Sequence, residues 1–311
     1  MTDSQLQKGL SDCRISCHQA AQALSAIPKD VPMPHGLPDA FCQLLANLRQ
    51  SLTSLGLAFK PPVTIPAALQ QLEKISEQIN QLISCAIMAK GELGKEWKEG
   101  ISAVEGELER HIQVLESGGD YLRSTGMVWE TIDRMTKDIS KDERSAVIRR
   151  WKSHQSVIKD AWEEYKETLE GDGENEDDGW DELGLGEGSL SDEEKARSTA
   201  IKPLLALHQL LHASMPRYLP QLPENDLTLL LTLSENLIDA YDELVSATHP
   251  GQDEEEIREA SIRLRDLSLK MASVVTDKSI DKWKERFQQE QEKWESRKLD
   301  MSNLSEALRD A

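Results

Sequence analysis

An acidic, glycine-rich stretch at residues 171–194 constrains this chain most, because it has almost nothing to contribute to a packed core. It reads GDGENEDDGWDELGLGEGSLSDEE, with eleven Asp and Glu, six Gly, and no Lys, Arg or His. Such a segment repels itself and buries too little apolar surface to offset its ordering entropy. We therefore predict an acidic disordered linker, which limited proteolysis should cut first between Gly171 and Glu187.

Helix-rich sequence flanks this linker on both sides. Residues 1–170 are predicted to form an N-terminal helical bundle, and residues 195–311 a C-terminal helical region. The second region contains the leucine-dense run TLLLTLSENLI, whose apolar face is larger than three or four helices would cover. This region is therefore open to packing on the first bundle as part of one core, and alone it should be less soluble than the whole chain.

Apolar residues recur at steps of three and four along both regions, which is the spacing of one helix face. No alternating strand pattern of useful length and no repeat period is evident. Long helices with short connections favour antiparallel neighbours. We predict an all-α fold of antiparallel up-and-down helical bundles with about ten helices, near residues 3–26, 38–56, 66–86, 92–116, 120–138, 140–169, 192–215, 224–247, 253–275 and 279–298.

Particular residues predict where some of these helices begin. Pro38 and Pro66 are each placed to open a helix. Ser140 followed by Glu143 is a capping-box pattern, which predicts a helix start at that serine. Pro203 interrupts a leucine-rich helix and should start or kink it.

The charge balance limits the classes of partner. The chain carries 56 acidic and 36 basic residues, a net charge of −20, of which the linker supplies −11. Because phosphate contacts need clustered Lys and Arg, broad nucleic-acid binding is not expected. An acidic surface suits basic partners or keeps the chain in solution.

The sequence also bears on the compartment. No run of eighteen or more apolar residues predicts a membrane span. The first residues, MTDSQLQKGLSDC, lack the basic start and apolar core of a secretory signal. We therefore expect a protein of the cytosol or the nucleus with reduced, buried thiols, at Cys13, Cys17, Cys42 and Cys85.

Nothing in the sequence predicts an active site. A Gly-rich phosphate loop, a CxxC pair, an HExxH motif and a nucleophile elbow are all missing from it. His208 and His212 have metal-ligand spacing, but two helical histidines beside a leucine stripe are far more often boundary residues. His111 follows Glu107 by four residues rather than three, unlike the ligands of helical-bundle metal enzymes. We predict no catalytic residue, no cofactor and no metal site.

Cysteine and tryptophan residues have both a structural and a functional reading. Cys13, Cys17 and His18 could supply thiolate and imidazole from one turn, but their place on an apolar stripe favours buried packing. Three tryptophans in the first region are interpreted as core or boundary residues, with one of them as an alternative partner anchor, at Trp129, Trp151 and Trp162. Trp129 belongs to the helix predicted near 120–138. The face of this helix that is expected to point inward carries Met127, Trp129, Ile132 and Met135.

Ser191, at the end of the acidic stretch, is the one residue for which a specific role is predicted. In the sequence Ser191-Asp192-Glu193-Glu194, the serine hydroxyl and the last carboxylate can form a reciprocal capping box. A serine followed by three acids also fits an acidophilic protein kinase, and a phosphate at a helix start can meet free backbone amides. We favour the cap as the constant role, with phosphorylation as a regulatory layer.

The order of several segments resembles that of a known family. GMVWETIDRM is followed by VIKDAWEEYKE at residues 157–167, an acidic spacer, SDEE, then AIKPLLALHQLL and LSENLIDAYDELV. From about Met127 to Val245 this resembles the cyclin D-binding protein family, also called cyclin D-interacting or maternal Id-like proteins. The resemblance implies an all-helical interaction protein of nucleus and cytoplasm. It further implies a negative effect on cell-cycle progression, through binding of cyclin D or of helix-loop-helix transcription factors.

We therefore predict a non-enzymatic protein-interaction module that masks partner surfaces with apolar helix faces. The alternative is a cytoskeletal adaptor, because long antiparallel bundles are similar to the helical rods of vinculin and talin. A metal-dependent hydrolase on a helical bundle is a third class, which paired Glu-x-x-His motifs on facing helices would indicate.

Overall fold

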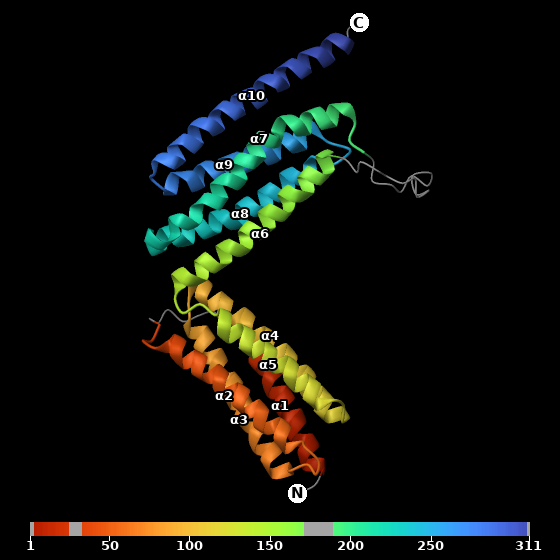
Figure 1. Cartoon of the computed structure of the whole chain (residues 1–311), viewed down its shortest axis with the longest axis vertical. Helices are drawn as coiled ribbons and strands as arrows, with labels where there is room; N and C mark the ends of the chain where they lie inside the picture. Colours follow the sequence, from red (N-terminus) through yellow and green to blue (C-terminus); the bar gives the residue numbers. More distant parts are fainter. Residues whose placement is uncertain (1–2, 25–32, 171–188, 310–311) are drawn as a thin grey trace, which may run out of the picture. The chain divides into compact units, whose positions relative to one another are not determined.

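The computed structural model describes residues 3–24, 33–170 and 189–309 of the chain (Figure 1). These residues form ten α-helices and two short 3-10 helices, and no strand occurs among them. The predicted all-α fold is therefore confirmed. Most of the predicted linker, residues 171–188, lies outside the described residues. Its last three residues, 192–194, are not linker, because they form the first turn of a helix.

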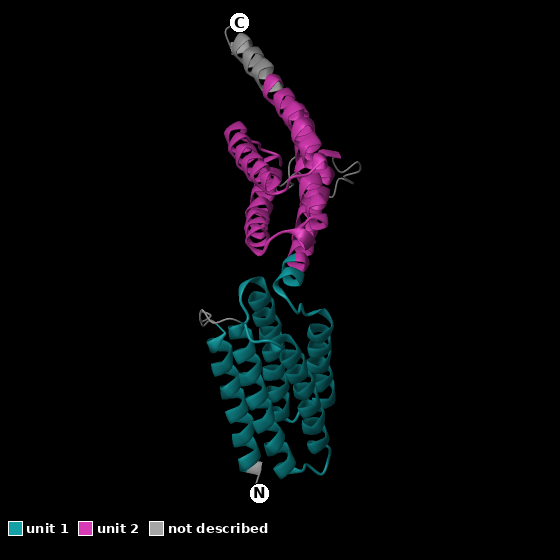
Figure 2. Cartoon of the chain, turned by 90° about the vertical axis from the view of Figure 1, so that its left-hand side faces the viewer, with its two compact units in different colours: residues 1–147 teal, residues 148–311 magenta. Residues whose placement is uncertain are grey.

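The chain divides into two compact units, residues 1–147 and residues 148–311 (Figure 2). This division differs from the boundary that composition predicted at the acidic stretch. It falls inside helix α6 (Glu143–Glu170), because most of this helix packs on the helices that follow the acidic stretch.

The first unit is a five-helix bundle. Its helices are α1 (Asp3–Ala23), α2 (Leu37–Ala58), α3 (Ile65–Met88), α4 (Gly91–Ser117) and α5 (Tyr121–Asp138). Around the bundle, α1 packs on α3, α3 on α2, α2 on α5, α5 on α4, and α4 on α1, while α3 and α4 also touch. Phe41 of α2 stacks on Trp97 of α4, with ring centroids 4.2 Å apart. Both side chains are buried, so this pair belongs to the core near the starts of these two helices.

Helix α5 turns a different face inward from the one expected. Its buried residues are Thr125, Val128 and Ile132, whereas Met127 is 45 % exposed. A step of three or four from Ile132 leads back to Val128, and from there to Thr125. The interpretation of Met127 as inward was wrong because it relied on the apolar character of this residue and not on this spacing.

The start of α6 also differs from the predicted capping box. Ser140 lies before the helix and donates from its amide and hydroxyl to the Glu96 carboxylate, at 2.6 and 2.8 Å. Asp142 caps α6 instead, since its carboxylate accepts from the Ser145 amide at 2.8 Å. Glu143, the expected partner of Ser140, accepts from amides at the start of α4.

The second unit contains the rest of α6 and four later helices. These are α7 (Asp192–Ser214), α8 (Glu224–Ala247), α9 (Glu254–Val274) and α10 (Lys278–Arg309), with 3-10 turns at Met215–Arg217 and Leu219–Gln221. α7 packs on α9 and α10, and α8 packs on α9. Pro203 lies inside α7 and does not start that helix, which begins eleven residues earlier at Asp192.

Candidate functional site

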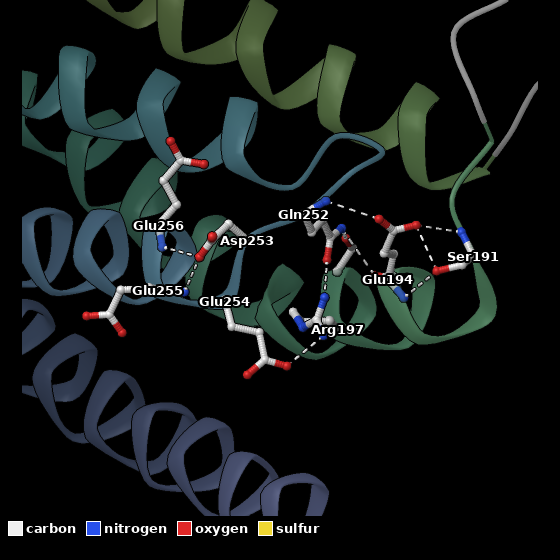
Figure 3. A network of polar contacts seen from close by, with 9 residues as sticks. Ser191, Glu194, Arg197, Gln252, Asp253, Glu254, Glu255 and Glu256 are labelled. Carbon is white, nitrogen blue, oxygen red and sulfur yellow. Dashed lines mark hydrogen bonds and ion pairs between the residues drawn. The ribbon is translucent and has the colours of Figure 1, made fainter. Parts of the chain in front are cut away.

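Ser191 caps α7 in the way that the sequence predicts (Figure 3). Its Oγ lies 3.4 Å from the Glu194 amide, which donates to it. The Glu194 carboxylate accepts from the Ser191 amide at 2.8 Å and from the Ser191 hydroxyl at 2.7 Å. The hydroxyl and the carboxylate thus satisfy donors at the helix start reciprocally.

The same carboxylate also binds a second segment of the chain. Glu194 Oε1 accepts from the amides of Gly251 and Gln252, in the loop between α8 and α9, at 2.8 and 3.0 Å. Nothing local in the sequence indicates this contact, because Gly251 lies 57 residues further along the chain. The cap of α7 is therefore also a clamp on the α8–α9 loop.

The hydrogen bonds that the Glu194 carboxylate accepts lower its pKa to about 2. The bonds from the Ser191 amide and hydroxyl contribute most, and those from the loop amides contribute less. Around it, Arg197 bonds Gln252 Oε1 at 2.9 Å and Glu254 at 2.8 Å. Asp253 caps α9 by accepting from the amides of the two residues after Glu254. The clamp thus joins the starts of α7 and α9 (Figure 3).

Phosphorylation of Ser191 stays a prediction. The residue is exposed, as a kinase would require. Its hydroxyl, however, lies 2.7 Å from a carboxylate oxygen of Glu194. A phosphate on this hydroxyl would bring two negative groups together, so the modification and the capping box would exclude one another.

Three buried histidines form a further polar cluster of the second unit. Ser234 of α8 lies between two of them, with its Oγ 2.8 Å from His154 Nδ1 and 2.7 Å from His212 Nε2. His208 Nδ1 lies 2.7 Å from Ser268 Oγ of α9. Since a hydroxyl carries one proton, Ser234 donates to one imidazole and accepts from the other.

The metal-spaced pair His208 and His212 is buried, with exposed fractions of 2 % and 1 %, so the interpretation of these histidines as surface or boundary residues was wrong. Each side chain meets a serine, and Trp151 of α6 stacks on His212 at 4.5 Å. Burial lowers the pKa of both histidines to about 3, with a further contribution from His154 at His212. Both imidazoles are therefore neutral at pH 7 and act as hydrogen-bonding groups between helices.

Other candidate side chains also serve packing. His111 is fully buried, with its Nδ1 2.7 Å from the Ser124 hydroxyl, and burial lowers its pKa to about 4. Cys13 and Cys17 are each 3 % exposed, whereas His18 is exposed and contacts Gln22. The prediction of buried thiols is confirmed for Cys13, Cys17 and Cys85 and was wrong for Cys42, which is only partly buried. Within the described residues, no three His, Cys, Asp or Glu side chains are grouped so that they could hold a metal ion.

The tryptophans follow the structural reading. Trp151 is fully buried and donates to the His212 carbonyl at 3.2 Å. Trp129 is half-buried under the Arg49 guanidinium, 5.2 Å from its ring centroid. Trp162 stacks on Tyr165 at 5.6 Å. The helical spacing missed a fourth, Trp97, whose distance of four residues from the buried Ile101 would have revealed it.

Two leucines that the sequence analysis did not single out are the most exposed large apolar side chains among those whose burial the structure describes. Leu57 near the end of α2 is 69 % exposed, and Leu122 in the first turn of α5 is 68 % exposed. The two helix ends meet, since the rings of Phe59 and Tyr121 lie 6.3 Å apart. We call Leu57 and Leu122 the leucine pair.

The fold and these sites define an all-α helical-bundle protein whose described polar clusters join helices. No described helix has an apolar stretch long enough for a membrane crossing. Residues 40–171 match the family model described as Grap2 and cyclin-D-interacting, N-terminal. This match confirms the resemblance to the cyclin D-binding protein family. The matched segment begins well before Met127 and ends well before Val245, the two bounds between which the likeness was expected to be clearest. It contains α3, α4, α5 and α6 in full. No curated protein matches the chain.

Proposed function

We propose that this protein regulates cell-cycle progression by binding cyclin D or a helix-loop-helix transcription factor, without catalysis, in cytoplasm and nucleus. The observation that carries the proposal is the match of residues 40–171 to a family described as cyclin-D-interacting. The chain would act by covering a surface of its partner. Its described polar clusters hold helices together, which is a structural role.

The leucine pair is the surface that we assign to this partner. Both side chains belong to the matched residues and expose apolar area at a junction of two helices. Burial of such side chains drives most protein association, and a few central residues supply most of the free energy of binding. The net charge of −20 in turn favours partners with a basic rim around an apolar contact.

Binding of the purified full chain to purified cyclin D and to a helix-loop-helix protein tests the function. The double variant Leu57→Ser, Leu122→Ser should weaken binding about tenfold or more, which is about 1.4 kcal/mol. Its unfolding free energy should change by only about 0.5 kcal/mol, since both side chains are exposed. Leu210→Ser is the matched control, because Leu210 is 59 % exposed on α7, outside the matched residues.

The possible outcomes test the proposed function and the proposed binding surface separately. Failure of the unaltered chain to bind either partner would reject the proposed function. Binding that survives the double variant would reject only the leucine pair. The cytoskeletal-adaptor alternative rests on bundle architecture, and sedimentation with actin filaments would detect it.

A further inference from the structure

Cys13 and Cys17 lie four residues apart on one face of α1 and interact with one another. Each side chain is 3 % exposed. Cys13 hydrogen-bonds Cys17 and the Ser76 hydroxyl of α3, while Cys17 faces the Glu105 and Glu109 carboxylates of α4. The pair therefore lies where three helices meet, and α1 is outside the residues that match the family.

The surroundings make the two thiols unequal. The hydrogen bond from Cys17, and then that from Ser76, lower the pKa of Cys13 against the effect of burial. The pKa of Cys17 is raised, first by the same hydrogen bond, then by burial, and also by the charges of Glu105 and Glu109. Cys13 is consequently the more acidic of the two thiols, and the thiolate is the nucleophile in cysteine chemistry.

A buried carboxylate adds to the polarity of this junction. Glu105 is 5 % exposed, and neither of its carboxylate oxygens has a hydrogen-bond partner among the described residues. Burial raises the pKa of Glu105 to about 7. The junction of α1 with α4 therefore holds a buried acidic group that acts on the Cys17 thiol.

We propose that Cys13 and Cys17 are a dithiol oxidation site for hydrogen peroxide, with Cys13 as the nucleophile and Cys17 as the resolving thiol. The Cys13 thiolate attacks one peroxide oxygen, the O–O bond breaks, and hydroxide leaves, which takes up a proton to become water. Cys17 then attacks the sulfur of the Cys13 sulfenic acid, an S–S bond forms, and a second water leaves with the Cys17 proton. In sum, two thiols and one peroxide give one disulfide and two waters.

The disulfide must change α1. Cβ atoms four residues apart on a helix are about 5–6 Å apart, whereas a disulfide holds them at about 3.5–4.5 Å. The turn between the two cysteines therefore has to distort when the bond forms. Because the same turn packs on α3 and α4, oxidation loosens α1 from the bundle. Peroxide reaches the pair when this terminal helix opens transiently.

The experiment treats the purified full chain with hydrogen peroxide, blocks remaining thiols with an alkylating agent, and maps the peptides after trypsin. Cleavage after Arg14 separates the cysteines, so a disulfide appears as peptide 9–14 linked to peptide 15–29. We expect loss of two of the four alkylatable thiols, with this linked pair as the product. Amide exchange in α1 should quicken on oxidation and return when dithiothreitol reduces the bond.

Variants assign the two roles. In Cys17→Ser the Cys13 sulfenic acid has no resolving thiol, so dimedone should label Cys13; in Cys13→Ser it should label nothing on α1. Cys85→Ser is the matched control, because Cys85 is a buried thiol whose pKa burial alone raises, and this variant should still form the linked peptides.

Three results would overturn the proposal. The first is oxidation of Cys42 or Cys85 in the wild-type chain while Cys13 and Cys17 stay reduced. This result does not depend on whether any variant folds. The second is dimedone on Cys17 of Cys13→Ser to the same extent as on Cys13 of Cys17→Ser. The third is a disulfide that forms without faster exchange in α1.

Discussion

At the residue scale, Glu194 has two tasks that a local pattern cannot separate. It completes the capping box of α7 with Ser191, and it holds the Gly251 and Gln252 amides of the α8–α9 loop. The first task follows from the S-x-x-E spacing. The second follows from the packing of the second unit, and it makes a single carboxylate a link between two elements.

Replacement of the capping serine tests both tasks. Ser191→Ala should cost about 1 kcal/mol at most in local helix stability, so amide exchange at residues 192–196 should quicken. Glu194→Ala should in addition quicken exchange at Gly251 and Gln252. Ser189→Ala, the same change two residues earlier, is the control and should leave these amides unchanged. Wild-type amides that already exchange at the unprotected rate would mean that no cap exists.

The buried histidines predict a pH dependence. His208 has a folded-state pKa of about 3, below its unfolded value of 6.5. Between these values the unfolded chain binds a proton that the folded chain does not, so its stability falls as the pH falls from about 6.5 toward 3. His208→Gln should remove up to about 1.4 kcal/mol per pH unit from this slope.

Urea unfolding at several pH values between 6.5 and 5 measures that slope. Glu105 acts in the opposite direction in this window, because burial raises its pKa to about 7, but its effect cancels between wild type and variant. His18→Gln, a change at an exposed histidine, is the control. Equal slopes in wild type and His208→Gln would contradict the prediction.

At the element scale, the start of α4 depends on a carboxylate from the start of α6. Glu143 accepts from the Glu92 and Leu93 amides at 2.9 and 3.0 Å. Gly91 makes room for this carboxylate with a φ of +59°, and a Cβ there would lie 2.4 Å from Glu143 Oε1. The helix start is thus satisfied from 50 residues away in the sequence.

Gly91→Ala should therefore destabilise the chain more than backbone strain alone does. Gly118 after α4 is the matched position, since its φ is +69° and a Cβ would meet nothing within 4 Å. Each substitution carries strain of about 1–2 kcal/mol, and Gly91→Ala should cost about 1 kcal/mol more because it displaces a cap. Urea unfolding of the two variants compares them, and equal costs would mean that Glu143 moves aside freely.

At the scale of the whole molecule, α6 is the helix that the C-terminal region lacks when it is cut at the acidic stretch. Trp151 and His154 bond to α7 and α8, and the Tyr165 hydroxyl donates to the Ser198 carbonyl of α7. Trp151 and Tyr165 are among the largest fully buried side chains of the chain. Without α6, their apolar contacts on α7 and α8 would face water.

We accordingly expect the fragment 195–311 to be poorly soluble and to melt without a cooperative transition. The fragment 143–311, which keeps α6, should stay in solution and melt cooperatively, as the second unit predicts. Thermal melting followed by far-ultraviolet circular dichroism distinguishes the two. A soluble, cooperatively melting 195–311 fragment would show that α6 is dispensable for the second unit.

The sequence by itself determined the helices and their local caps. Apolar spacing of three and four residues placed the ten helices closely, except that α10 runs on to Arg309 instead of ending near residue 298. The S-x-x-E pattern identified the Ser191 cap. These features are readable because a helix turn and a capping box involve only residues within four positions of one another. The order of segments likewise indicated a resemblance to the cyclin D-binding protein family, and the match of residues 40–171 confirms that resemblance.

Tertiary structure alone decided which carboxylate caps which helix and where the units divide. The pattern Ser140–Glu143 predicted a box, yet each residue binds a partner more than 40 positions away. Composition changes at the acidic stretch, yet the units divide inside α6, because side chains of this helix pack on α7 and α8. Such contacts depend on which helix faces meet, and a local spacing carries no information about a partner far along the chain.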